Sequence, residues 1–373
     1  MKRIAALIFI LLLFCLASFP ASAKTAVPKG DASPAETEKE NLREGLLAIL
    51  PDPAKEVLPD PTDKDALDEA LGFRAVFSLF AEGLASEGSL LSGRLLLLLA
   101  LTLFFGAAAL FTRGSASGIF MQSASALALF SLLWGTADRV FSFFADLSKL
   151  ALGLSPLYVS LLAAGGGTAS AGTAGAGFAA FLSVLELFST TVFPPLLRML
   201  FALALLSALG NHTLIRELSR RLSGVAILLF SVLSMLLLAS LSFQGSLASS
   251  ADSVAIRTVK YTASSAIPLV GGTVSGALGA LHASLSLLKS TLGGTAVIAL
   301  LFLLLPPLLE VFLLRVALSF CESIAAFTEA GALGETISRF RSIMDMTLAA
   351  LVTVSILFLL TVGICTGLSP FGG

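Results

Sequence analysis

Six segments of the chain are apolar over lengths that suit a membrane crossing: 95–111, 120–137, 178–209, 224–243, 296–320 and 347–365. A helix needs about 20 apolar residues to cross the hydrocarbon core of a bilayer, and in lipid its backbone polar groups must bond to one another. The composition agrees, because 56% of the 373 residues are hydrophobic and only 13% are charged. We predict an all-α polytopic membrane protein with about six transmembrane helices. Segment 178–209 leaves an alternative, since its Pro194-Pro195 could divide it into two short crossings.

The N-terminus has the three parts of a secretory signal. Lys2 and Arg3 precede a short apolar run, and Ala21-Ser22-Ala23 supplies small residues for cleavage. We expect residues 1–23 to be removed as a signal peptide, which places the following segment outside the cytoplasm. An even number of crossings then returns the C-terminus to that side.

Residues 24–93 differ from the rest of the chain because they are acidic and rich in proline. This composition predicts a small extracytoplasmic segment with Pro-Asp-Pro spacers. An amphipathic helix is expected from Thr62, with an apolar face that packs on the protein's own membrane domain or docks elsewhere. Residues 94–373 are assigned to the multi-span membrane domain.

An internal duplication is indicated within the membrane domain. The motif at 193–197, which contains Pro194 and Pro195, reappears at 305–309 with Pro306 and Pro307, an offset of 112. Pro156 reappears as Pro268 at the same offset. We predict parallel repeat halves at about 137–243 and 251–365, with the proline pairs as candidate hinges.

Two outer segments, 138–177 and 244–294, are too polar to cross the membrane simply and too apolar to be free loops. They could form re-entrant hairpins that line a cavity, or helices that lie flat on the outer face. Gly271 and Gly272 are the candidate re-entrant positions, because small residues let helices approach closely.

Four ionisable residues fall within the predicted spans: Glu186, Arg198, Glu310 and Arg315. Such residues cost free energy in lipid and therefore pair with one another or face a cavity. Arg198 and Glu310 are equivalent under the 112-residue offset, so we predict that they interact. The four residues could form a structural charge network, line a conduit, or reach the membrane surface.

The sequence lacks the usual carriers of chemistry. It has no phosphate-binding loop, no Gly-x-Ser-x-Gly elbow and no His-Glu-x-x-His motif, and its three cysteines and two histidines are scattered. We expect no enzymatic activity, no cofactor and no metal. The net charge of −1 gives no basic surplus for nucleic acid.

The stretch 248–290 resembles the stage III sporulation protein AE family of endospore-forming bacteria. The resemblance is carried by Ala-Asp-Ser-Val-Ala-Ile-Arg-Thr-Val-Lys-Tyr at 251–261 and Ile-Pro-Leu-Val-Gly-Gly at 267–272. It implies a mother-cell membrane protein in a channel or secretion-like complex that meets the forespore and sustains it. Its partners would be the lipid bilayer and the other membrane proteins of that complex, and a second copy of the chain is a further candidate. The alternative is a self-contained small-solute transporter with its site at the repeat interface.

Overall fold

The computed structural model describes residues 34–111, 116–164, 168–209, 271–328 and 330–367, apart from positions 59 and 62, with four isolated positions between 221 and 235. All regular structure in these ranges is helical. The predicted signal peptide lies outside them, as does the predicted span 224–243 apart from three of the isolated positions. The helices are α2 (Pro34–Ile49), α3 (Asp52–Val57), α4 (Lys64–Ala70), α5 (Phe73–Phe111), α6 (Ala116–Ala164), α7 (Thr168–Glu186), the π-helix η1 (Leu187–Val192), α8 (Phe193–Leu209), α10 (Gly271–Phe327) and α11 (Gly331–Gly367).

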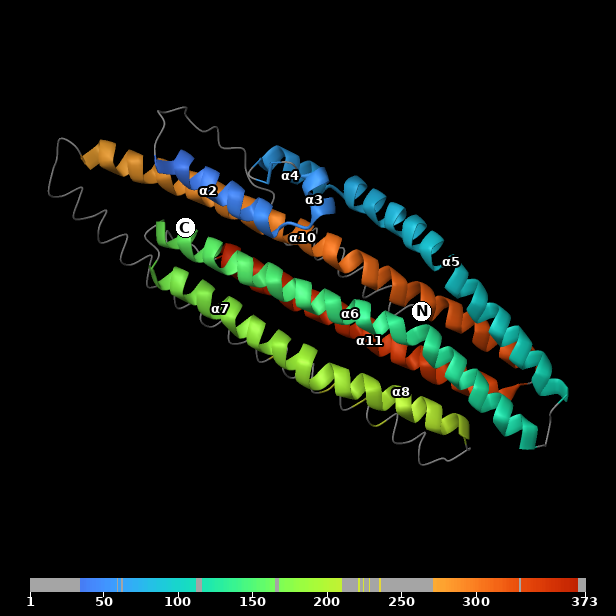
Figure 1. The fold of residues 1–373 in the computed structure, drawn as a ribbon. Coiled ribbons are helices and arrows are strands. Elements are labelled where there is room, and N and C mark those ends of the chain that lie inside the picture. Colours follow the sequence, from blue (N-terminus) through green and yellow to red (C-terminus); the bar gives the residue numbers. More distant parts are fainter. Residues whose placement is uncertain are drawn as a thin grey trace.

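Long helices lie side by side along one axis and form an elongated bundle (Figure 1). Helices α5 and α10 run one way, as does the rod of α7, η1 and α8, while α6 and α11 run the opposite way. Five of these described helices or rods are long and apolar enough to cross a membrane. Helix α8 ends and α10 begins at opposite ends of the bundle (Figure 1).

The rod that contains the first proline pair has no turn within it. Helix α7 passes through η1 into α8, and the residues on either side of η1, Glu186 and Phe193, keep right-handed helical dihedral angles. Residues 168–209 therefore run in a single direction, in agreement with one crossing rather than two. A wide π-turn directly before Pro194 accommodates a pair of residues that cannot donate backbone hydrogen bonds.

The second proline pair lies inside the unbroken helix α10. Because proline lacks an amide hydrogen, the carbonyls of Phe302 and Leu303 lose their usual helical donors at Pro306 and Pro307. The two rods with proline pairs run in the same direction, as parallel repeats require (Figure 1). They differ locally, since only the first contains a π-turn, and the duplication and the hinges stay predictions.

The expected outer segments are continuations of long helices where the structure describes them. Residues 138–164 extend α6, and Gly271 and Gly272 form the first turn of α10 rather than a re-entrant loop. Along 138–164 the polar residues fall on the exposed face, while Phe144 and Leu147 on the other face are fully buried. A periodic amphipathic pattern of this kind suits a bundle helix. Residues 244–270 lie outside the described ranges.

The N-terminal segment is more structured than its composition predicts. Helix α2 packs against α6 and α10, and its Leu42 and Leu46, with Leu50 directly after it, belong to the core of the bundle. The spacer at Pro51 has extended dihedral angles, but the residues after it form the short helix α3. The helix expected from Thr62 is divided into α4 and α5 at residues 71–72.

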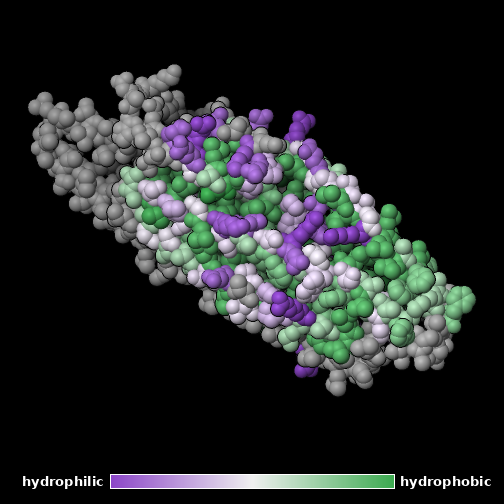
Figure 2. Space-filling view, viewed as in Figure 1, coloured by the Kyte–Doolittle hydropathy of each residue, from purple (hydrophilic) through white to green (hydrophobic). Residues whose placement is uncertain are grey.

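The surface of the bundle changes along its length (Figure 2). In this view apolar residues cover the end at which α10 turns into α11, and hydrophilic residues are spread over the middle of the face. We call the part built from residues 95–111, 116–136, 196–209, 311–327 and 331–349 the apolar half, and the other described residues the charged half. The predicted domain boundary at 93/94 falls within α5, where these halves meet.

Candidate functional site

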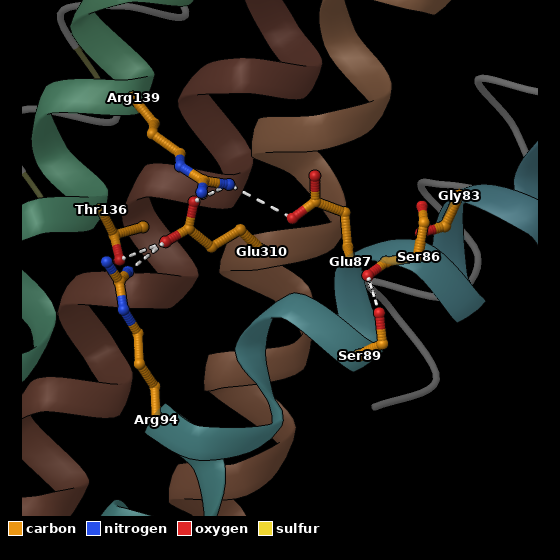
Figure 3. Close-up of polar contacts among 8 residues, drawn as sticks. All are labelled: Gly83, Ser86, Glu87, Ser89, Arg94, Thr136, Arg139 and Glu310. Atoms are coloured by element: carbon orange, nitrogen blue, oxygen red, sulfur yellow. Dashed lines mark hydrogen bonds and ion pairs between the residues drawn. The ribbon is translucent and has the colours of Figure 1, made fainter.

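The carboxylate of Glu310 is fully buried at the junction of the two halves, on α10. Arg94 of α5 donates a hydrogen bond of 3.1 Å from Nη1 to Glu310 Oε1, and Thr136 of α6 donates one of 3.1 Å to the same oxygen. Nη1 of Arg139, also on α6, lies 3.0 Å from Glu310 Oε2 as an ion pair without hydrogen-bond alignment. Figure 3 shows both guanidinium groups converging on the one carboxylate. Glu310 therefore ties α5 and α6 to α10.

A second carboxylate completes this group. Nη1 of Arg139 donates to Glu87 Oε2 of α5 at 3.2 Å, and the Glu87 side chain is only 12% exposed (Figure 3). We call Glu87, Arg94, Thr136, Arg139 and Glu310 the Glu310 cluster. Its two cations and two anions balance formally. The arginines are 43% and 42% exposed, so their charged heads also reach the surface.

Close approach of α5 to α10 positions this cluster. A Cβ atom at Gly83 would lie 2.8 Å from a methyl carbon of Leu305 and 3.1 Å from one of Leu309, so the small residue lets the helices meet one turn before Glu87. Ser86 and Ser89 turn their hydroxyls back to carbonyls of their own helix, at 3.0 and 2.8 Å (Figure 3). This local bonding satisfies polar side chains on α5 without a partner helix.

A separate set of ion pairs holds the α10–α11 hairpin in the apolar half. Arg315 pairs with Asp345, and Glu322 pairs with Arg341. Within α11, Arg339 pairs with Glu335 at 3.0 Å, one helical turn apart. The Arg315 side chain is only 8% exposed, so its charge depends on Asp345 rather than on water.

The predicted charge network is thus divided by the structure. Glu310 and Arg315 both join α10 to other helices, but they do so through different partners. Arg198 is exposed on α8, and the predicted Arg198–Glu310 pair is not formed, because Arg94 and Arg139 occupy the carboxylate. Glu186 is exposed at the end of α7. A functional role for these residues stays a prediction.

In the sequence, Arg94 and Arg139 are only two of several charges next to predicted spans. Each borders an apolar run, while Glu310 lies within one, and this combination is the signal that could have suggested the cluster. Arg94 is 216 residues and Thr136 is 174 residues from Glu310 in the sequence. At such separations the sequence does not tell which residues lie at the same depth in the bundle as Glu310.

The cluster has the chemistry of a structural tie. It contains carboxylate acceptors, two permanently charged donors and one hydroxyl, that of Thr136, which is buried and donates to a carboxylate already held by two guanidinium groups. Among the described residues no group of three or more His, Cys, Asp or Glu could hold a metal ion. Cys321 and Cys365 are buried thiols.

Comparison of the sequence with known protein families identifies the family of this chain. The profile of the family described as Stage III sporulation protein AE matches residues 66–369, a range that runs from α4 beyond the end of α11 and includes every residue of the Glu310 cluster. The chain belongs to this family. It is a stage III sporulation membrane protein with several membrane-spanning helices.

The sequence was also compared with curated proteins and with solved structures. Stage III sporulation protein AE of Bacillus subtilis (strain 168) is 25% identical over 215 residues, which are 58% of this chain and 54% of the relative. The matched region thus spans about half the length of that relative. No solved structure matches the chain.

Proposed function

We propose that this chain is a membrane subunit of a channel or secretion-like complex between the mother cell and the forespore, and that it sustains the development of the engulfed forespore. Its place would be the mother-cell membrane that surrounds the forespore. The family match over residues 66–369 carries the proposal, because it covers nearly all of the membrane domain. The partners would be other membrane proteins of the same complex.

The geometry of the charges supports a structural subunit over an enzyme. In the Glu310 cluster and in the α10–α11 hairpin, acids meet bases from neighbouring helices. Removing one member of a buried pair leaves an uncompensated charge, so such pairs specify which helices adjoin. The described part of the chain also has a charged half that a simple span would not require, which offers surface to other proteins.

Affinity purification from sporulating cells tests the proposal. The tagged full-length chain is extracted in a mild detergent after cross-linking, and co-purifying proteins are compared with those of an unrelated tagged membrane protein from the same cells. We expect a reproducible set of membrane proteins made at the same developmental stage. Recovery of the chain alone, with and without cross-linking, would contradict a role as a complex subunit.

Reconstitution separates this proposal from the transporter. The purified chain in liposomes is expected to show no saturable uptake of small solutes, because the proposed passage requires other subunits. Saturable, gradient-driven uptake of a defined solute by the chain alone would instead support a self-contained carrier. A chain purified with Glu310→Gln serves as the matched control for any flux, since it removes the buried charge at the junction of the halves.

A further inference from the structure

The exposed large apolar side chains are concentrated in one half of the bundle. In the charged half, those within the named helices are Phe77, Leu90, Leu152 and Leu187, and Leu228 and Met235 are exposed at the isolated described positions outside these helices. In the apolar half they occur on four helices and form a belt around that end: Leu96, Leu97, Leu103, Phe104, Phe111, Phe120, Leu127, Met199, Leu206, Phe320 and Phe327. Exposed apolar surface of this extent is typical of a contact with lipid or another protein.

The charges have the opposite distribution. Exposed acids and bases recur along the charged half, for example Glu82 on α5, and Asp138 and Lys149 on α6. In the described residues of the apolar half every acid and base except Arg198 is in an ion pair within the α10–α11 hairpin. This distribution matches the rule that ionisable groups in a bilayer pair with one another inside the protein.

The length of the apolar half matches the thickness of a lipid bilayer. Residues 95–111 of α5 and 311–327 of α10 each rise by about 26 Å at about 1.5 Å per residue. The hydrocarbon core of a bilayer is about 30 Å thick. The whole of α6 is far longer than this, because its 49 residues extend about 73 Å. A single bilayer therefore covers one half of α6 and leaves the other half outside.

Three arginines lie close to the junction of the halves. Arg94 and Arg139 meet at Glu310, and Arg198 follows Phe193, whose ring is 6.0 Å from that of Phe141 on α6. All three are exposed and come from three different helices. Arginines at this depth can extend their heads to lipid phosphates while their stems cover apolar surface.

We propose that the bilayer surrounds only the apolar half, with its surface at Arg94, Arg139 and Arg198, and that the charged half stands outside the membrane as a helical stalk. The stalk includes α2–α4, so it lies on the same side as the N-terminal segment. Its own core consists of the parts of α10 and α11 beyond the junction, which are apolar because protein surrounds them. This inference concerns position in the membrane and does not depend on the proposed channel function.

Two matched pairs of cysteine substitutions test the position. Phe77 and Phe104 on α5 are 59% and 62% exposed, and Leu152 and Leu127 on α6 are 59% and 61% exposed. Each pair shares residue type, helix and exposure, and differs only in the half that it occupies. Each is replaced by cysteine in a full-length chain whose natural cysteines, Cys15, Cys321 and Cys365, are alanine.

The variants are reconstituted in liposomes and treated with N-ethylmaleimide, which crosses bilayers but reacts with the thiolate formed in water. We expect Phe77→Cys and Leu152→Cys to react, and Phe104→Cys and Leu127→Cys to lose nearly all reaction. A sample unfolded in urea and SDS gives the total thiol, and a single elution peak before reconstitution identifies folded variants. Protection of all four cysteines, reaction of all four, or the reverse pattern would each overturn the proposal.

Discussion

The charged half and the apolar half are built from the same continuous helices, yet they place their apolar residues in opposite ways. In the charged half most large apolar residues lie inside, and exposed acids and bases recur on the surface. In the apolar half large apolar side chains face outward, while the charges of the α10–α11 hairpin pair within the protein. The difference teaches that an apolar helix need not be a lipid-facing one.

The spans themselves make this point. The most apolar stretches, in α10 and α11, are 61% and 67% buried within the protein, whereas that of α5 is only 22% buried. High hydropathy of a helix can therefore reflect contact with lipid, burial in the protein core, or both. If the two halves meet different surroundings, charge removal should cost more in the apolar half than at the junction, and packing changes should matter in both.

Breaking the hairpin pair is expected to have the largest effect. Arg315→Met leaves Asp345 without its partner in the apolar half and should lower stability by about 3–5 kcal/mol, as for other broken buried pairs. Thermal unfolding in detergent and protein level in membranes measure the loss. The exchange Arg315→Asp with Asp345→Arg should restore part of it, and absence of any restoration would argue that the two residues act separately.

Neutralising the buried carboxylate at the junction should cost less. Glu310→Gln removes the charge that Arg94 and Arg139 share, but both arginines retain exposed heads, so we expect a loss of about 2 kcal/mol. The same unfolding assay applies, and Glu82→Gln, an exposed glutamate of α5, is the control. A loss for Glu310→Gln that equals or exceeds that for Arg315→Met would contradict the comparison between the halves.

Helix approach in the charged half is tested by a pair of glycines on α5. Gly83→Leu would overlap Leu305 and Leu309 of α10 and should lower stability by about 1–3 kcal/mol. Gly88 lies on the same helix with no neighbouring atom within 4 Å of an added Cβ, so Gly88→Leu is the matched control. Similar unfolding temperatures for the two variants would show that α5 does not depend on this contact.

The smallest expected difference compares two buried hydroxyls. Thr136 donates to Glu310, and Thr136→Val should lower stability by about 1 kcal/mol. The hydroxyl of Tyr158, fully buried in the charged half, has no hydrogen-bond partner within the described residues, so Tyr158→Phe should cause no loss. A larger loss for Tyr158→Phe than for Thr136→Val would indicate a polar partner for Tyr158 that the described residues do not include.

Sequence reasoning predicted the helical class, the family and most of the spans because these depend on composition and local pattern. The 93/94 boundary, chosen from charge and proline content, stays a prediction. The helix from Thr62 was expected, and its Leu67 is buried as an inward-facing residue should be. Composition, short motifs and local periodicity were sufficient for the predictions that hold.

The relations between distant segments could not be predicted in the same way. The offset of 112 residues made Arg198 and Glu310 equivalent, but equivalent positions in two rods need not face each other. Helix α2 was missed because acids and prolines dominate its neighbourhood in the sequence. Its core leucines, and Leu50 directly after it, are buried only by contact with distant helices such as α6 and α10. Polar residues in 138–164 suggested a separate outer segment, although they mark the exposed face of one long helix.

The packing of α2 bears on the order in which the protein matures. Ile49 and Gly45 of α2 fit against Gly153 and Leu157 of α6, and α2 also packs on α10, which is more than two hundred residues further along the chain. At a synthesis rate of about 5–20 residues per second, roughly 10–50 seconds separate the appearance of α2 from that of α10. During this interval Leu42, Leu46 and Leu50 cannot complete their burial. The first helix of the bundle to be made is thus among the last to be enclosed, which makes the nascent N-terminal segment the part most in need of protection until α10 arrives.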